Sequence, residues 1–106
     1  MVTARIVKKS NKYVSFCCEG HAGYADAGED IVCSAISILT INTANSITEL
    51  TNSMIDIEYV EGYISWKFHD FIDEKAILLM DSMLLGLKTI EDTYNKKYLT
   101  LIIEEV

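Results

Sequence analysis

The sequence contains no proline, and this absence by itself indicates no function. Only three of the 106 residues are cysteines, two of them adjacent, which does not match the framework of a secreted disulfide protein. We therefore expect a protein of the reducing cytoplasm. No N-terminal signal pattern is visible, because Arg5, Lys8 and Lys9 interrupt a strand-like run, and no stretch that approaches a membrane span is expected.

Basic residues are scarce, since 9 Lys and Arg stand against 16 Asp and Glu and give a formal net charge of −7. This excess argues against a general binder of phosphate backbones, so direct contact with nucleic acid is not expected. The negative charge is compatible with the attraction of a basic partner. Half of the residues are hydrophobic, and the length suits a single domain over residues 1–106 with one core.

Hydrophobic patterns predict five strands and two helices. Strands are expected at residues 2–7, 13–18, 55–60, 63–68 and 98–103, where β-branched and aromatic residues alternate with polar ones. Apolar residues three and four positions apart predict helices at 31–52 and 71–94, with Asp30 and Asp70 as N-caps. The ββαββαβ order predicts an α+β fold, with two long helices packed on a mostly antiparallel sheet.

Alternation in strand 13–18 places Cys17 and Cys18 on opposite faces, so the two thiols cannot easily serve one site. It also places Tyr13 with Cys17, away from the face of Phe16 and Cys18.

Helix 31–52 carries a second apolar stripe through Ile31, Ile38 and Ile41. That stripe predicts contact with a second copy of the chain, giving a homodimer.

The most informative segment joins the second strand to the first helix. His21 follows the strand, a loop punctuated by Gly20, Gly23 and Gly28 comes next, and Cys33 is expected in the first helical turn. A helix N-terminus and a nearby imidazole both favour the nucleophilic thiolate. Histidine, loop and cysteine together predict a cysteine-dependent hydrolase whose loop closes over the substrate.

Several alternatives stay open at this point. Cys33 is also compatible with an inert core residue, and Asp30 either caps the helix or orients His21. A zinc site would use Cys18, His21, Cys33 and a carboxylate, but the spacing matches no common zinc pattern. The glycine-rich loop lacks the lysine of a phosphate-binding loop. His69 is interpreted as structural.

The chain closely resembles the ribosomal-processing cysteine protease family, Prp. The matching motif is Gly20-His21-Ala22-Gly23-Tyr24, followed by Gly28-x-Asp30-Ile31-Val32-Cys33-Ser34-Ala35. The resemblance extends to length and element order. It implies that Cys33 is the nucleophile and His21 the catalytic histidine. It also implies a cytoplasmic homodimer that removes a short N-terminal extension from a large-subunit ribosomal protein.

The resemblance implies acyl transfer without a metal or cofactor. His21 takes the proton of Cys33, the thiolate attacks the scissile carbonyl, and His21 protonates the leaving amine. The backbone amide of Cys33 or Ser34 is a candidate donor to the oxyanion, so Ser34 and Asp30 are provisional supporting residues. The alternative function is a non-catalytic binding module that assists ribosome assembly, in which Cys33 would be inert.

Overall fold

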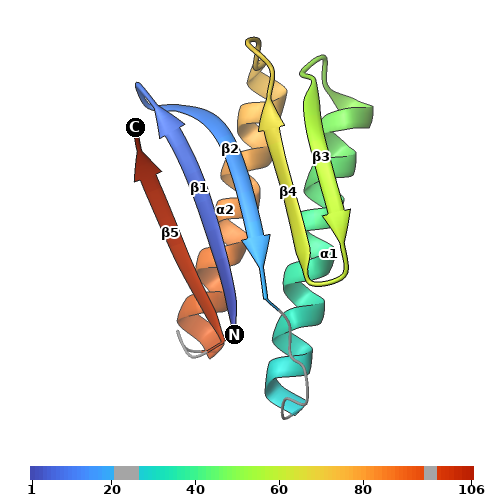
Figure 1. Cartoon of the computed structure of the whole chain (residues 1–106), viewed down its shortest axis with the longest axis vertical. Coiled ribbons are helices and arrows are strands. Elements are labelled where there is room, and N and C mark those ends of the chain that lie inside the picture. Colours follow the sequence, from blue (N-terminus) through green and yellow to red (C-terminus); the bar gives the residue numbers. More distant parts are fainter. Residues whose placement is uncertain (21–26, 95–97) are drawn as a thin grey trace.

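In the computed structural model the described residues are 1–20, 27–94 and 98–106, and residues 27–30 are described by their backbone alone. Five strands and two helices form the fold (Figure 1). They are β1 (Val2–Lys9), β2 (Lys12–Glu19), α1 (Ala27–Leu50), β3 (Ile55–Val60), β4 (Tyr63–Phe68), α2 (Glu74–Tyr94) and β5 (Leu99–Glu105). The predicted ββαββαβ order is confirmed.

The strands form one mixed sheet in the order β3-β4-β2-β1-β5. Only β1 and β5 pair in parallel, and the other three neighbouring pairs are antiparallel. Both helices lie on the same face of the sheet and pack against each other (Figure 1). The predicted α+β architecture, two helices on a mostly antiparallel sheet, is therefore confirmed.

Two tight turns set the register of the hairpins. Ser10 and Asn11 have φ values of 51° and 63°, which are typical of a two-residue type I′ turn. This turn places Lys9 opposite Lys12. Gly62 has a φ of 78° in the Glu61-Gly62 turn between β3 and β4. Both hairpins thus follow from local turn chemistry.

The core lies between the sheet and the helices. Phe16 of β2 and Trp66 of β4 are almost fully buried, with ring centroids 4.6 Å apart. Burial of a large apolar side chain contributes roughly 1.5–3 kcal/mol, so this face of the sheet fixes the register of the central strands. Gly86 of α2 lies against Leu39 of α1, since a Cβ at Gly86 would be 2.8 Å from a Leu39 methyl carbon.

Tyr13 departs from the predicted alternation. Val7 pairs with Ser15 but Lys8 pairs with Tyr13, so a bulge at Val14 shifts the phase of β2. Tyr13 is consequently buried on the same face as Phe16 and Cys18, whereas the sequence pattern placed it on the other face. Its hydroxyl donates a hydrogen bond to the Asp81 carboxylate of α2.

Both helices begin at other residues than predicted. α1 starts at Ala27, so Asp30 is its fourth residue and the predicted cap is wrong. α2 starts at Glu74 and is capped by Asp73 rather than Asp70, because Asp73 Oδ1 accepts from the Ala76 amide at 2.8 Å. Asp73 Oδ2 also accepts from the Asn52 amide at 2.9 Å, which ties the end of α1 to the start of α2.

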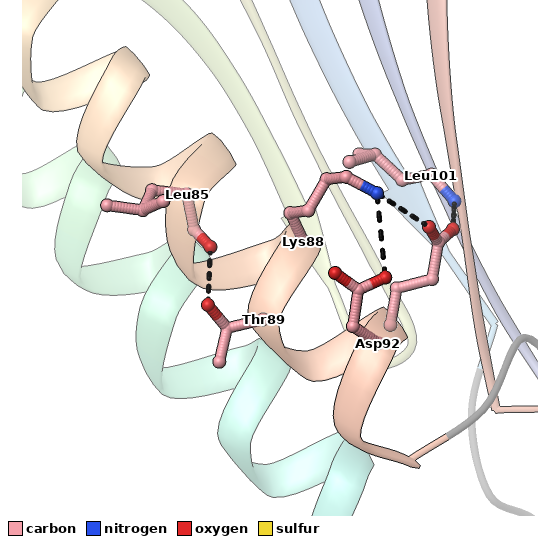
Figure 2. A network of polar contacts seen from close by, with 6 residues as sticks. Leu85, Lys88, Thr89, Asp92 and Leu101 are labelled. Carbon is pink, nitrogen blue, oxygen red and sulfur yellow. Dashed lines mark hydrogen bonds and ion pairs between the residues drawn. The ribbon is translucent and has the colours of Figure 1, made fainter.

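The inward face of α2 includes one carboxylate. Met80 and Leu87 are buried, whereas Ile77 is 38% exposed and Glu91 is buried. Glu91 Oε2 accepts from the Leu101 amide of the edge strand β5 at 2.8 Å. Figure 2 shows this end of α2, where Lys88 Nζ also lies 3.5 Å from Asp92 Oδ1. A charge-assisted hydrogen bond thus covers part of the β5 edge.

The expectation that no stretch approaches the length of a membrane span is wrong, because one segment is long and apolar enough to cross a membrane. Ile31–Leu50 within α1 has the length and the hydropathy, 1.4, that a crossing helix needs. Val32, Ile36, Ala44 and Ile47 of this stretch are buried in the core. Core helices of soluble proteins pass the same test, so the stretch is weak evidence for a membrane span.

Candidate active site

A cavity of about 220 Å³ lies where the N-terminal half of α1 passes the end of β2 and the turn between β3 and β4. We name it the thiol cavity, because both Cys18 and Cys33 line it. Ile36, Thr40 and Ile41 of α1, Gly20 after β2 and residues 59–64 of the hairpin form most of the remaining wall. In Figure 1 it corresponds to the lower end of the sheet.

Cys33 lies inside α1 rather than in its first turn. The helix begins at Ala27, so Cys33 is the seventh residue, about 9 Å along the axis at 1.5 Å per residue. The thiol is half-buried and packs against the core at the cavity wall. Because the helix dipole acts mainly within the first turn, it stabilises a Cys33 thiolate less than it would at the predicted position in that turn.

Cys18 is the second thiol of the cavity and differs from Cys33 in its burial. It is 6% exposed, and burial, together with the neighbouring Cys17, Cys33 and Glu19, raises its pKa to about 12. Its thiol is therefore neutral at physiological pH. The predicted contrast with Cys17, half-exposed on the opposite face, is confirmed. The cysteines form no disulfide.

Gly20 has a steric reason to be glycine. Its φ is +119°, and a Cβ there would lie 2.2 Å from the carbonyl oxygen of Met1. Its amide donates to the carbonyl of Gly62 at 3.0 Å. Gly20 thus joins the start of β1, the end of β2 and the β3–β4 turn, which together frame the thiol cavity. From the sequence, Gly20 is expected only as one of the three loop glycines, without this steric role.

The other predicted supporting residues lie on α1. Gly28 is the second residue of the helix, not a loop residue, and Ser34 is exposed. Inside an α-helix each amide donates to the carbonyl four residues earlier, so the amides of Cys33 and Ser34 are committed to the helix. The predicted oxyanion donation from either amide is therefore not favoured by the position of α1.

His21 and Gly23 lie outside the described residues, as does most of the predicted lid over Ala22 to Glu29. The last three residues of that lid, 27–29, belong to α1. Within the described part of the chain, no cluster of three His, Cys, Asp or Glu side chains has the arrangement of a metal site. The zinc alternative includes His21 and therefore stays untested. His69 contacts Asp56 Oδ1 through Nε2 at 2.9 Å.

The sequence brings Cys18 and Cys33 together only as ligands in the zinc alternative, and not as the two thiols of one cavity. The two residues are fifteen positions apart, and nothing in their spacing indicates that they line one cavity. The only available signal was alternation in β2, which places Cys18 on the face with Phe16. Because both helices cover that same face, Cys18 and α1 had to lie close together.

Comparison with known proteins agrees with this architecture. The family model for cysteine protease Prp matches residues 1–99. The ribosomal processing cysteine protease Prp of Staphylococcus aureus strain Mu50 is 33% identical over 99 residues, covering 91% of this chain and 93% of that protein.

Two crystal structures of the essential ribosomal processing protease Prp from S. aureus are also similar. One is in complex with a covalently linked product peptide and is 30% identical, with a TM-score of 0.87. The other is in complex with a substrate peptide and is 28% identical, with a TM-score of 0.89. Each match covers 98% of this chain and 100% of the S. aureus chain.

Proposed function

The chain belongs to the Prp family of cysteine proteases, and from this premise we propose that it removes a short N-terminal extension from a large-subunit ribosomal protein. Cys33 supplies the thiolate nucleophile and His21 the general acid and base. The similarity to a ribosomal processing protease that binds a substrate peptide supports the choice of substrate. The alternative of a non-catalytic assembly module is not favoured by membership of a protease family.

The observation that carries the proposal is the difference between the two thiols of the thiol cavity. Burial raises the pKa of Cys18 to about 12, so Cys18 cannot supply a thiolate near neutral pH. Cys33 lines the same cavity, is more exposed, and follows the histidine motif by twelve residues. Cys33 is therefore the nucleophile that this cavity offers to a peptide.

The reaction is acyl transfer in two steps. The Cys33 thiolate attacks the scissile carbonyl carbon, and the C–N bond breaks as His21 protonates the leaving amine. Water, activated by His21, then hydrolyses the thioester and restores the thiol. Asp30, on the preceding turn of α1, is proposed to orient the imidazole. The covalently linked product peptide of the S. aureus relative supports a covalent intermediate.

Charge favours a basic substrate. The chain has a net charge of −7, and Glu61 is the one charged residue among the described residues that line the thiol cavity. A positively charged ribosomal protein would be attracted to this surface, which raises the association rate more than the affinity.

Mass spectrometry tests the proposal. The full chain is incubated with each purified large-subunit ribosomal precursor of the same cell, and intact masses are followed. One precursor should lose a fixed N-terminal peptide, and Cys33→Ala should abolish this loss. Cys17→Ala is the matched control, because it removes a thiol from the opposite face of the sheet and should cleave normally. Cleavage by Cys33→Ala at the wild-type rate would exclude Cys33 as nucleophile.

We also propose that the protein is a cytoplasmic homodimer. Cysteines that form no disulfide suit a reducing compartment. Ile31 and Ile38 of α1 are 57% and 72% exposed, while Ile41 of the predicted stripe instead lines the thiol cavity. Leu85 of α2, beside the Gly86–Leu39 contact, is 71% exposed, so the outer helix layer offers an apolar patch to a second copy.

Sedimentation at micromolar concentration tests the dimer. The 11.9 kDa chain should sediment at about twice its mass. Ile38→Glu combined with Leu85→Glu should produce monomers, whereas Thr48→Glu, on an exposed polar position of α1, should not. A wild-type monomer would contradict the proposal.

A further inference from the structure

A second and larger cavity, of about 810 Å³, lies at the opposite end of the sheet from the thiol cavity. It forms where the β1–β2 turn and the end of β4 meet the start of α2, at the upper end in Figure 1. We name it the lysine cavity after Lys8, Lys9, Lys12 and Lys67, which line it with Phe71 and Asp81. Its volume lies in the range of small-molecule sites.

The charge of this cavity is opposite to that of the chain. Four of the nine basic residues line it, against two carboxylates, Asp70 and Asp81, although acidic residues outnumber basic ones in the sequence. None of the four ammonium groups has a carboxylate within ion-pair distance among the described residues. The cavity therefore concentrates positive charge that the protein itself does not neutralise.

Two carboxylates near the lysines, those of Asp81 and Asp56, have hydrogen-bond partners other than the lysines. The hydroxyl of Tyr13 donates to Asp81, and Asp56, the strand partner of Lys67, accepts from His69 at 2.9 Å. Lys9 and Lys12 face each other directly across the turn, an arrangement of like charges that destabilises a hairpin. An anion bound between these lysines would remove that repulsion.

Aromatic surface lies beside the lysines. Phe71, in the segment between β4 and α2, lines the cavity and is 61% exposed. The ring of Tyr13 is held by Asp81 and carries the Lys8 ammonium 4.7 Å from its centroid. An exposed aromatic ring such as Phe71, next to lysines without a carboxylate partner, is typical of surfaces that stack bases and hold phosphates.

From this juxtaposition we propose that the lysine cavity binds a nucleotide, with its phosphate between Lys9 and Lys12 and its base against Phe71. The same chemistry is presented by a free nucleotide and by a nucleotide within single-stranded RNA. The net charge of −7 opposes general binding of nucleic acid, so the interaction is confined to this end of the sheet. The proposal does not depend on proteolysis.

Fluorescence anisotropy of the full chain tests it. The probes are a fluorescein-labelled octauridylate RNA and, as competitor, free UMP. Lys9→Gln with Lys12→Gln should weaken RNA binding at least tenfold and reduce the slope of log affinity against log salt by about 0.7, as expected for the loss of the one phosphate that these two lysines hold. Lys75→Gln with Lys88→Gln removes the same charge outside the cavity, and binding should stay within about threefold of wild type.

Phe71→Ala is an independent variant that leaves every lysine in place. It should weaken binding about 5- to 150-fold, the range of one aromatic–base stack. Competition by UMP would identify a free nucleotide as a ligand, and RNA binding without competition would identify the strand. Absence of RNA and UMP binding overturns the proposal, as do equal losses in the two lysine pairs or equal affinity for an octaglutamate peptide.

Discussion

The two ends of the sheet differ in nearly every physical property that decides what they bind. The thiol cavity is about 220 Å³, contains two thiols, and has Glu61 as the one charged residue among its described lining residues. The lysine cavity is about 810 Å³ and is lined by four lysines. The formal net charge of −7 does not indicate the local charge of either cavity, so inferences from net charge apply to the chain as a whole and not to its sites.

Different devices hold the two ends together. At the thiol cavity the strand ends are held by the Gly20 backbone. Only glycine at this position permits the close approach of the Met1 carbonyl, and its amide donates to the Gly62 carbonyl. Near the lysine cavity the two segments are joined by the Asp73 carboxylate, which accepts hydrogen bonds from Ala76 in the first turn of α2 and from Asn52 and Ser53 after α1. Substitutions at one end should therefore leave the chemistry of the other end unchanged.

The largest expected effect lies within the thiol cavity. At pH 7 a thiol of pKa about 12 is ionised in a fraction of about 10⁻⁵, whereas an ordinary thiol is ionised to about 3%. Cys33 should therefore react with iodoacetamide at least about 10³-fold faster than Cys18. Peptide mapping of the alkylated chain after timed quenching measures both rates. Rates within tenfold of each other would contradict the contrast between the two thiols.

Removal of the histidine should have the next largest effect. His21→Ala should lower the rate of precursor cleavage about 10²- to 10⁴-fold, because general acid and base catalysis is lost. It should also move the pH dependence of Cys33 alkylation to higher pH, since an imidazolium no longer favours the thiolate. His69→Ala is the control, because this residue contacts Asp56 far along the chain from the motif. An unchanged alkylation profile together with unchanged cleavage would remove His21 from the mechanism.

Gly20→Ala tests the device that frames the thiol cavity. A Cβ would meet the Met1 carbonyl oxygen at 2.2 Å and would place alanine at a φ of +119°. The free energy of unfolding should fall by about 1–3 kcal/mol, the cost of a strained backbone residue. Urea denaturation measures it. Ser82→Ala, at an exposed position of α2, is the matched control and should change stability little. Wild-type stability in Gly20→Ala would show that the strand ends shift without cost.

The sequence predicted the strands well because alternation and turn residues act locally. The Glu61-Gly62 turn fixes the register of β3 and β4, and the Ser10-Asn11 turn fixes that of β1 and β2 as far as the bulge at Val14. The helix starts were less predictable. Asp70 was the predicted cap of α2, whereas Asp73 is the observed one, and its carboxylate is held by Asn52 and Ser53, which come from another part of the chain.

The candidate site was predictable only in part. Cys33 and its motif are visible in sequence, and three of the four cavity lysines lie within five residues, 8–12. Lys67 joins them only because β4 pairs with β2, and Tyr13 faces the core only because of the bulge at Val14. The β2–β4 pairing joins segments far apart in the sequence, and the bulge interrupts the strict alternation on which the prediction for Tyr13 depended.

The smallest expected effect concerns Asp73, close to the lysine cavity. Hydrogen bonds from the backbone amides of Ala76 and Asn52 lower the pKa of Asp73 below its usual 3.8; burial opposes them, and the Ser53 hydroxyl adds a further lowering. Asp73 therefore binds a proton more readily in the unfolded chain than in the folded one. Its contribution to the free energy of unfolding is complete above about pH 4 and is lost as the pH falls through the lowered pKa.

Asp73→Asn removes this titrating charge but keeps an oxygen that can cap α2. The variant should therefore show a shallower fall of Tm than wild type between about pH 4 and pH 2, measured by circular dichroism. Asp70→Asn removes a charge from the same segment without those three hydrogen bonds and should keep the wild-type slope. Neither variant should change the rate of Cys33 alkylation. A change in that rate would show that the two ends of the sheet are coupled, and the comparison between independent sites would have to be given up.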